Sequence, residues 1–174
     1  MTSSAEEVHH GAPQHPDFKP KRTIVFPVDS SDHSKNTIIW ALENLLTDQD
    51  QAILMNVRSG VLSIFNVNMG YPYAPTVYPE ETVHRVEDAE KAASHELLLN
   101  YSKMLVAKKI HTKAIALRGE ARSELVTTIN SLKPSLVVLG SRGLSNIATS
   151  LLGSVSNYLL HNCECPVLIL PAKK

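Results

Sequence analysis

Residues 136–154, LVVLGSRGLSNIATSLLGS, decide how the rest of the chain is interpreted. The first four of them are continuously apolar, which is typical of a strand that is covered on both faces of a parallel sheet. Gly140 ends this run, and the loop that follows carries Gly143 and Gly153. A second apolar run, Pro166–Leu170, comes after an intervening helical segment. The region therefore predicts two strands joined by a glycine-bearing loop and a helix.

The alternation of strands and helices continues toward the N-terminus. Three earlier strands are expected at Thr23–Val28, Ala52–Val57 and His111–Leu117. Apolar residues at helical spacing predict helices over residues 32–47, 80–109, 121–132 and 154–162. Strands that alternate with helices pair in parallel through right-handed crossovers. The chain thus predicts one α/β domain, a doubly wound, open, parallel five-stranded sheet with helices on both faces.

The composition limits the classes of function. The 174 residues are 43% hydrophobic and 20% charged, with a formal net charge of zero. A nucleic-acid interface needs an excess of Lys and Arg to neutralise phosphates, so no nucleic-acid partner is expected. No run reaches the roughly 18 apolar residues of a membrane span, so no membrane partner is expected either. With two cysteines in a C-x-C pair, the default prediction is a cytoplasmic protein.

Two segments stand outside the regular pattern. Residues 1–20 are polar and predict a flexible N-terminal arm ahead of a domain at 21–174. The arm's histidines favour a solvated tail over a metal site, and no metal ligands are predicted elsewhere. Residues 59–81 are rich in Tyr and Pro; they fit either a lid over a ligand or a surface loop, and we favour the loop.

The end of the first strand carries an acidic residue. Pro27 disfavours the middle of an interior strand, so the strand is expected to end close to it. Asp29 follows directly, and its carboxylate suits either a ligand's hydrogen-bond donors or the start of the next helix. Both interpretations of Asp29 stay open. For Ser31, Asp32 and Ser34 we favour helix capping.

The glycine-bearing loop has the chemistry of an anion site. Glycines allow the backbone to approach a ligand closely, and successive backbone N–H groups form an anion-binding nest. Gly153 and Ser154 stand where a helix begins, which adds positive potential for a phosphate, and Ser156 adds a hydroxyl. The chain lacks a P-loop motif and a dinucleotide G-x-G-x-x-G motif. This pattern predicts modest phosphate binding through backbone amides and hydroxyls, with weak or absent hydrolysis, and no catalytic residue is predicted.

Over about residues 22–172 the sequence resembles the universal stress proteins. The resemblance rests on Pro27-Val28-Asp29, the strand AILMNV at 52–57, Gly119 before the third helix, and the loop G-x-x-G-x9-G-[ST]. In this chain that loop is formed by Gly140, Gly143, Gly153 and Ser154.

The resemblance implies a strand order of 3-2-1-4-5 and membership of the ATP-binding branch of the family. It implies ATP, or AMP or ADP, as ligand, with magnesium a candidate companion of the nucleotide. It also implies a homodimer through the edge strand Pro166–Leu170, acting in a stress response. The implied nucleotide-binding residues are Pro27, Asp29, Val57, Gly140, Arg142, Gly143, Gly153, Ser154, Val155 and Ser156.

Two other hypotheses are kept beside a nucleotide-responsive binding module. The first is an enzyme, either a slow ATPase or an adenylyl-chemistry relative of the same architecture. Its motivation is residues 29–34, DSSDHS, although they lack the glycines of the pyrophosphatase loop. The second is a flavodoxin-like electron carrier. It lacks the Ser/Thr-rich phosphate loop after the first strand, so the binding module is favoured.

Overall fold

The computed structural model describes residues 6–8, 18–59, 79–141 and 152–171, with backbone alone for residues 6–8. Residues 60–78, which form most of the Tyr/Pro-rich segment, lie outside the described part of the chain. The elements in chain order are β1 (Glu6–Val8), β2 (Arg22–Pro27), α1 (Asp32–Asn44), β3 (Asp50–Arg58), α3 (Glu80–Val106), β4 (His111–Arg118), α4 (Ala121–Leu132), β5 (Leu136–Gly140), α5 (Ser154–Asn162) and β6 (Val167–Leu170).

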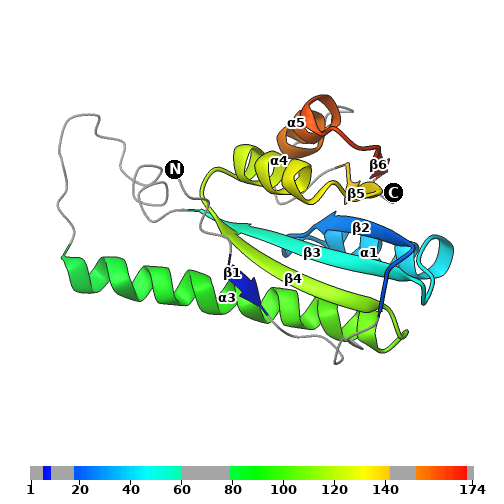
Figure 1. The fold of residues 1–174 in the computed structure, drawn as a ribbon. Helices are drawn as coiled ribbons and strands as arrows, with labels where there is room; N and C mark the ends of the chain where they lie inside the picture. The colour runs from blue at the N-terminus through cyan, green and yellow to red at the C-terminus, as the bar shows by residue number, and fades with distance from the viewer. Residues whose placement is uncertain (1–5, 9–17, 60–78, 142–151, 172–174) are drawn as a thin grey trace.

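Five of these strands form the predicted parallel sheet. Its order is β4-β3-β2-β5-β6, so strands two to six of the chain stand in the order 3-2-1-4-5. The winding direction reverses between β2 and β5, which are neighbours in the sheet although the chain visits β3 and β4 between them (Figure 1). The fold class and the strand order are therefore confirmed.

A sixth strand extends the sheet at the β4 edge. β1 pairs antiparallel with β4, with Glu6 opposite Ala116, Glu7 opposite Ile115 and Val8 opposite Ala114. No strand is predicted from the sequence in this part of the chain. The physical reason is that a three-residue strand of sequence EEV carries no periodic signal, and its pairing partner lies more than a hundred residues away.

Helices cover both faces of the sheet. α1 and α3 lie on one face and α4 and α5 on the other (Figure 1). On the first face Ile24, Phe26 and Leu54 pack with Ile38 of α1 and Leu98 of α3. On the second face Val25, Ile53, Met55 and Val137 pack with Leu125 and Ile129 of α4 and Leu159 of α5. Because successive strand residues point to opposite faces, each buried strand contributes apolar side chains to the packing on both faces of the sheet.

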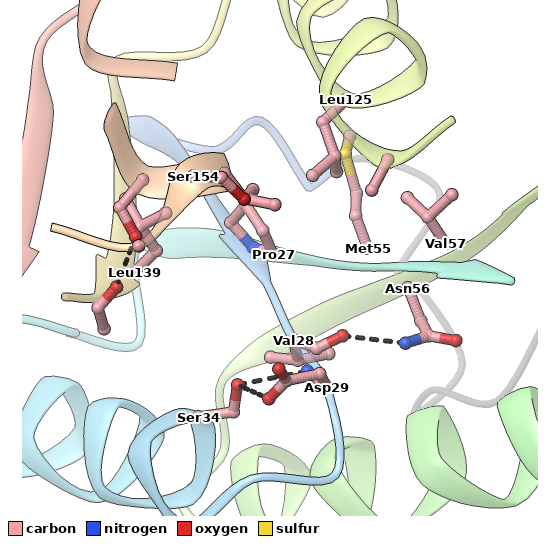
Figure 2. A pocket seen from close by; sticks show the side chains of 15 residues that line it. Pro27, Val28, Asp29, Ser34, Met55, Asn56, Val57, Leu125, Leu139 and Ser154 are labelled. Atoms are coloured by element: carbon pink, nitrogen blue, oxygen red, sulfur yellow. Dashed lines mark hydrogen bonds between the residues drawn. The ribbon is translucent and has the colours of Figure 1, made fainter. Parts of the chain in front are cut away.

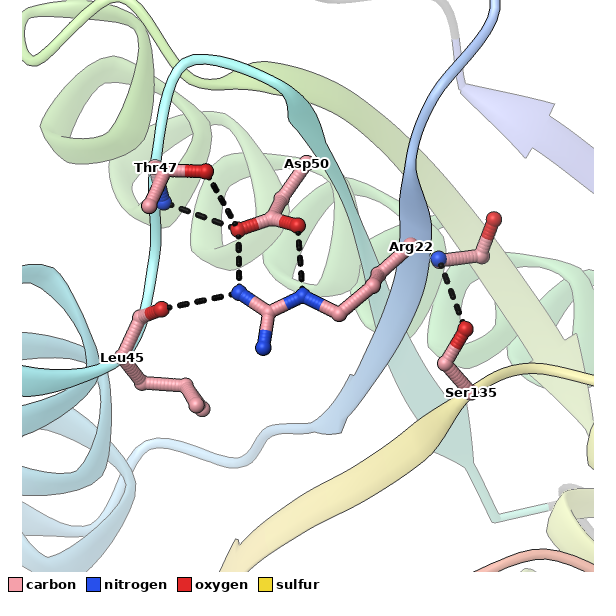
Figure 3. Close-up of polar contacts among 6 residues, drawn as sticks. Arg22, Leu45, Thr47, Asp50 and Ser135 are labelled. Atoms are coloured by element: carbon pink, nitrogen blue, oxygen red, sulfur yellow. Dashed lines mark hydrogen bonds and ion pairs between the residues drawn. The ribbon is translucent and has the colours of Figure 1, made fainter.

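An ion pair holds the amino ends of β2 and β3 together (Figure 3). Arg22 donates from Nε to Oδ1 of Asp50 at 2.8 Å and from its terminal nitrogen to Oδ2 at 2.6 Å. Thr47 donates to Oδ2 from its backbone N–H and its hydroxyl, each at 2.9 Å. The Arg22 hydrogen bonds lower the pKa of Asp50 against the opposing effect of burial. These contacts lie at the opposite end of the strands from the glycine loop, so their role is structural.

Pro27 marks the place where the sheet opens. The N–H of Val28 donates to the carbonyl of Met55 on β3, so by alternation the nitrogen of Pro27 faces β5. The β2–β5 pairing covers only Ile24 with Leu136 and Val25 with Val137. Pro27 therefore removes no ladder hydrogen bond, and the carboxyl ends of β2 and β5 separate beyond Val25. This separation is the crevice that the switch point of an open α/β sheet provides for a ligand.

Candidate functional site

A cavity of about 200 Å³ occupies this crevice. Its walls come from the ends of β2, β3 and β5, the start of α1, one side of α4 and the start of α5 (Figure 2). The lining residues are Pro27, Val28, Asp29, Ser34, Met55, Asn56, Val57, Ala121, Leu125, Leu139, Gly140, Gly153, Ser154, Val155 and Ser156.

The described residues donate hydrogen bonds to only one of the two carboxylate oxygens of Asp29. Its Oδ1 accepts hydrogen bonds from the hydroxyl of Ser34 at 2.6 Å and from the hydroxyl and N–H of Ser31 at 2.5 and 3.1 Å. Among the described residues no donor reaches Oδ2. Asp29 therefore presents one carboxylate oxygen that is held in place and a second that is free to accept a hydrogen bond from a ligand.

The two serines after Asp29 have different roles. Ser31 is the N-cap of α1, because its hydroxyl accepts from the N–H of Ser34 at 3.2 Å, and this confirms it as a capping residue. The Ser34 hydroxyl instead accepts from the N–H of Asp29 at 3.0 Å and donates back to its carboxylate. Ser34 is 8% exposed, so it is a buried brace for Asp29 rather than a cap.

Side chains from two further elements support the backbone around Asp29. Asn56 at the end of β3 donates to the carbonyl of Val28 at 2.8 Å and accepts from Ser94 of α3 at 2.7 Å. Tyr101, also on α3, donates to the carbonyl of Asp29 at 3.1 Å. Burial, together with the negative charges of Asp29 and Asp32, raises the pKa of Tyr101 to about 12, so its hydroxyl remains a donor.

The opposite wall is the N-terminus of α5. Gly153 is its N-cap and has no side chain to cap the helix; the first helical hydrogen bond runs from Asn157 to the Gly153 carbonyl at 2.9 Å. Within the described residues the N–H groups of Ser154, Val155 and Ser156 have no acceptor, and all three residues line the cavity. Such free N–H groups at a helix start are donors for an anion.

The structure brings most of the predicted site residues together. Pro27, Asp29, Val57, Gly140, Gly153, Ser154, Val155 and Ser156 all line the one cavity. Arg142 and Gly143 lie outside the described residues. The hydroxyl of Ser156 donates to the carbonyl of Gly140 at 2.9 Å and is buried, so this side chain ties α5 to β5. The exposed Ser154 keeps its hydroxyl available beside the cavity.

A comparison with models of protein families shows which family the chain belongs to. The model described as the universal stress protein family matches residues 21–171. The chain belongs to the universal stress protein family.

Two relatives illustrate the range of lengths in which this domain occurs. The uncharacterized protein C167.05 of Schizosaccharomyces pombe is 30% identical over 151 residues, which cover 87% of this chain and 23% of that protein. Universal stress protein YxiE of Bacillus subtilis is 27% identical over 148 residues, which cover 84% of this chain and 97% of that protein. The chain therefore spans nearly the whole of one universal stress protein and under a quarter of the other protein.

A solved structure supports the fold. The Arabidopsis thaliana universal stress protein family protein with AMP bound superposes with a TM-score of 0.63 at 19% identity, covering 87% of this chain and 92% of that one. At this level of identity the similarity shows the shared architecture of the universal stress proteins.

Sequence reasoning missed part of the cavity wall of this universal stress protein. Met55, Leu125 and Leu139 form an apolar side, and Leu125 comes from α4, the helix before the strand that leads into the glycine loop. The helical spacing of Leu125 and Ile129 signalled a buried face, but spacing does not say that this face borders a ligand cavity. Asn56 had a signal, since it is a polar residue inside the apolar strand AILMNV.

Gly119 fixes the path from β4 into α4. Its φ of +141° is a conformation that L side chains rarely adopt, and its N–H donates to the carbonyl of Arg58 at 3.1 Å. A Cβ at this position would stand 2.9 Å from Cγ of Glu124. The glycine therefore sets the start of the helix that carries Ala121 and Leu125 into the cavity.

Two cysteine thiols lie outside the lining of this cavity. Cys163 and Cys165 are free thiols; burial raises the pKa of both, that of Cys163 to about 11 with a contribution from Cys165. This argues against the thiolate that an oxidant sensor needs.

Residues 6–8, 18–59, 79–141 and 152–171 contain no cluster of potential metal ligands. In the same ranges no helix combines the length and the apolar character needed to cross a membrane.

Proposed function

We propose that this protein belongs to the ATP-binding branch of its family and binds an adenine nucleotide, ATP or AMP, in the crevice between β2, β5 and α5. The observation that carries the proposal is the polarity of the crevice. One wall presents the carboxylate oxygen of Asp29 that has no donor among the described residues, and the facing wall presents the three N–H groups at the start of α5 that have no acceptor among them. A ligand with a neutral, donor-rich end and an anionic end matches both walls.

The polarity also orients the nucleotide. A phosphate is repelled by Asp29 and attracted by the α5 N-terminus, so it lies against Ser154 and Val155. The ribose hydroxyls or the adenine amino group then donate to Asp29. The apolar side formed by Met55, Leu125 and Leu139 faces the base. The relative with AMP bound supports this ligand class.

We favour a nucleotide-responsive binding module in the stress response over an enzyme. The cavity's described lining offers one carboxylate, three serines, an asparagine and backbone amides, and it brings no lysine or arginine to a transferring phosphoryl group. Magnesium belongs with the bound triphosphate in this proposal. The slow-ATPase alternative predicts steady turnover that is lost in the variant described next.

Replacement of Asp29 by Asn is the sharpest test. The amide oxygen of Asn takes over the hydrogen bonds from Ser31 and Ser34, while the amide nitrogen turns the free acceptor into a donor. Because a hydrogen bond to a charged group contributes about 1.5–3 kcal/mol, the variant should bind ATP roughly 10- to 100-fold more weakly in calorimetric titration with Mg²⁺.

Asp32→Asn is the matched control. Asp32 lies in the first turn of α1, is exposed and does not line the cavity, so this variant makes the same charge change nearby. It should bind ATP within about twofold of the parent protein, since exposed charges are screened by solvent. No binding of ATP or AMP to the nucleotide-stripped parent would end the proposal, and equal weakening in both variants would remove the role of Asp29.

We also propose a homodimer through β6. This strand ends the sheet, and all four of its residues are apolar and half-buried. The carbonyls of Pro166 and Leu170 accept from β5, so the N–H of Ile169 faces outward. Ile169→Pro should keep the fold but sediment as a monomer, because it removes a donor that only edge pairing uses. A dimer that persists in this variant contradicts the proposed interface.

The cytoplasmic location stays a prediction.

A further inference from the structure

The two edges of the five-stranded parallel sheet differ in whether a further strand pairs with them. No strand of the described residues pairs with the outer edge of β6, whereas the β4 edge is covered by β1, which lies beside it on the side away from β3 (Figure 1). β4 is eight residues long, and β1 covers three of them. A long uncovered edge strand is a template for pairing with another chain, so the cover on β4 calls for an explanation.

The described residues before β2 contact the sheet at three places, each one strand farther from the centre of the sheet. The N–H of Lys21 donates to the carbonyl of Gln49, next to β3, at 2.8 Å. The ring of Phe18 stacks on His111, the first residue of β4, with 3.4 Å between the ring centroids and 18° between their planes. β1 then pairs along β4. The arm is thus attached at successive points on the sheet.

The backbone of β4 determines which groups β1 covers. The N–H of Gly119 donates to Arg58 of β3, so by alternation the odd-numbered residues of β4 face β3. The backbone N–H and C=O groups of Ala114 and Ala116 therefore face outward. These are the residues that lie opposite Val8 and Glu6, while Glu7 stands opposite Ile115. Consequently the N–H groups of Glu6 and Val8 face β4, and that of Glu7 faces away.

The uncovered β4 edge would be complementary to itself. In an antiparallel pair of two β4 strands centred on Ile115, Ala114 lies opposite Ala116 and the outward backbone groups match. Lys113 then lies opposite Leu117, and Thr112 lies opposite Arg118. No charged residue faces a like charge, which is the condition for favourable cross-strand pairing and for a two-fold symmetric contact.

We propose that the outer edge of β4 is a strand-docking surface for a second copy of this chain, and that the N-terminal arm occupies it as an intramolecular cap. The arm competes for the backbone groups of Ala114 and Ala116. While it is paired, association is confined to other surfaces such as β6; when it is released, two copies pair through β4. The inference is independent of the nucleotide site, and it concerns the sheet edge opposite the proposed β6 dimer.

The test compares two proline variants of the full chain, Glu6→Pro and Glu7→Pro. Each removes one carboxylate and one N–H, but only Glu6→Pro removes an N–H that faces β4 and places a proline ring against that strand. The loss of about one backbone hydrogen bond should speed hydrogen exchange of the Ala114 and Ala116 amides roughly tenfold in Glu6→Pro. In Glu7→Pro these amides should exchange within about twofold of the parent.

Two readouts make the result decisive. The Ile53 and Leu54 amides in the centre of the sheet should exchange equally in all three proteins, which shows that the fold is intact. In sedimentation velocity, Glu6→Pro should form a larger species than the parent at the same concentration. Equal exchange at Ala114 and Ala116 in both variants would overturn the cap. Faster exchange without new association would overturn the second copy as its competitor.

Discussion

Replacement of Arg22 by Met tests whether the ion pair at the amino ends of β2 and β3 stabilises the fold. Met keeps the apolar stem of the side chain but removes the guanidinium that makes two hydrogen bonds to Asp50 and one to the carbonyl of Leu45. Asp50 is 0% exposed, so the variant leaves a buried carboxylate whose remaining partner among the described residues is Thr47.

The magnitude follows from this geometry. Breaking a buried ion pair by removing one partner costs about 3–5 kcal/mol. The Arg22 side chain is 38% exposed and Thr47 keeps two donors on Asp50, so the loss should be smaller. We expect about 2–3 kcal/mol of lost unfolding free energy in urea denaturation at pH 7.

The pH dependence has a definite sign. In the parent the pKa of Asp50 is lowered, so the stability it contributes is present above the unfolded pKa and is lost as pH falls through the folded pKa. Without Arg22, burial is opposed only by the two Thr47 hydrogen bonds, so the pKa of Asp50 should be higher in the variant than in the parent. The variant's penalty is therefore largest at neutral pH and shrinks as the pH falls and the Asp50 carboxyl takes up a proton.

The same substitution at an exposed pair is the control. Arg122 pairs with Glu120 at 2.8 Å, and the two side chains are 47% and 53% exposed. Arg122→Met should cost less than about 1 kcal/mol, because solvent screens this pair. If Arg22→Met costs no more than Arg122→Met, or costs the same at acidic pH as at pH 7, the reasoning about Asp50 is refuted.

Two further predictions concern Gly119 and Cys163. Gly119→Ala should cost roughly 1–3 kcal/mol in urea denaturation, since it forces a side chain into φ +141° and against Glu124. Glu124→Ala in the same chain should recover only the part due to the contact, and full recovery would contradict the conformational argument. Cys163, with its pKa raised to about 11 from 9.0, should react with iodoacetamide at pH 8 roughly 100-fold more slowly in the folded protein than in urea. Equal rates in both conditions would show that its burial does not protect the thiol.

Several features of the site were accessible from local sequence patterns. Gly153-Ser154 at the start of a helical segment and Asp29 after an apolar run are adjacent-residue signals, and the structure places both beside one cavity. Each is a statement about where a strand or helix ends. Because the carboxyl ends of parallel strands meet at one edge of the sheet, ends predicted separately were expected to lie together.

Other features depend on contacts between distant residues. The Asn56 side chain reaches Val28, and Tyr101 reaches Asp29 across 72 positions of the chain. Leu125 borders the cavity because Gly119 sets the path of α4. No periodicity in the sequence encodes which of the two oxygens of Asp29 is engaged, because that depends on how Ser31 and Ser34 are placed around it.

The sequence by itself determined the α/β class, the number of parallel strands and the residues at the strand ends, because periods of 2 and 3.6 residues are local properties of the chain. Only the tertiary structure decided that β2 and β5 separate beyond Val25, that the hydrogen bonds from Ser31 and Ser34 converge on one oxygen of Asp29, and that β1 returns to β4. These depend on the register between segments far apart in the chain, and register is set by packing of the whole sheet.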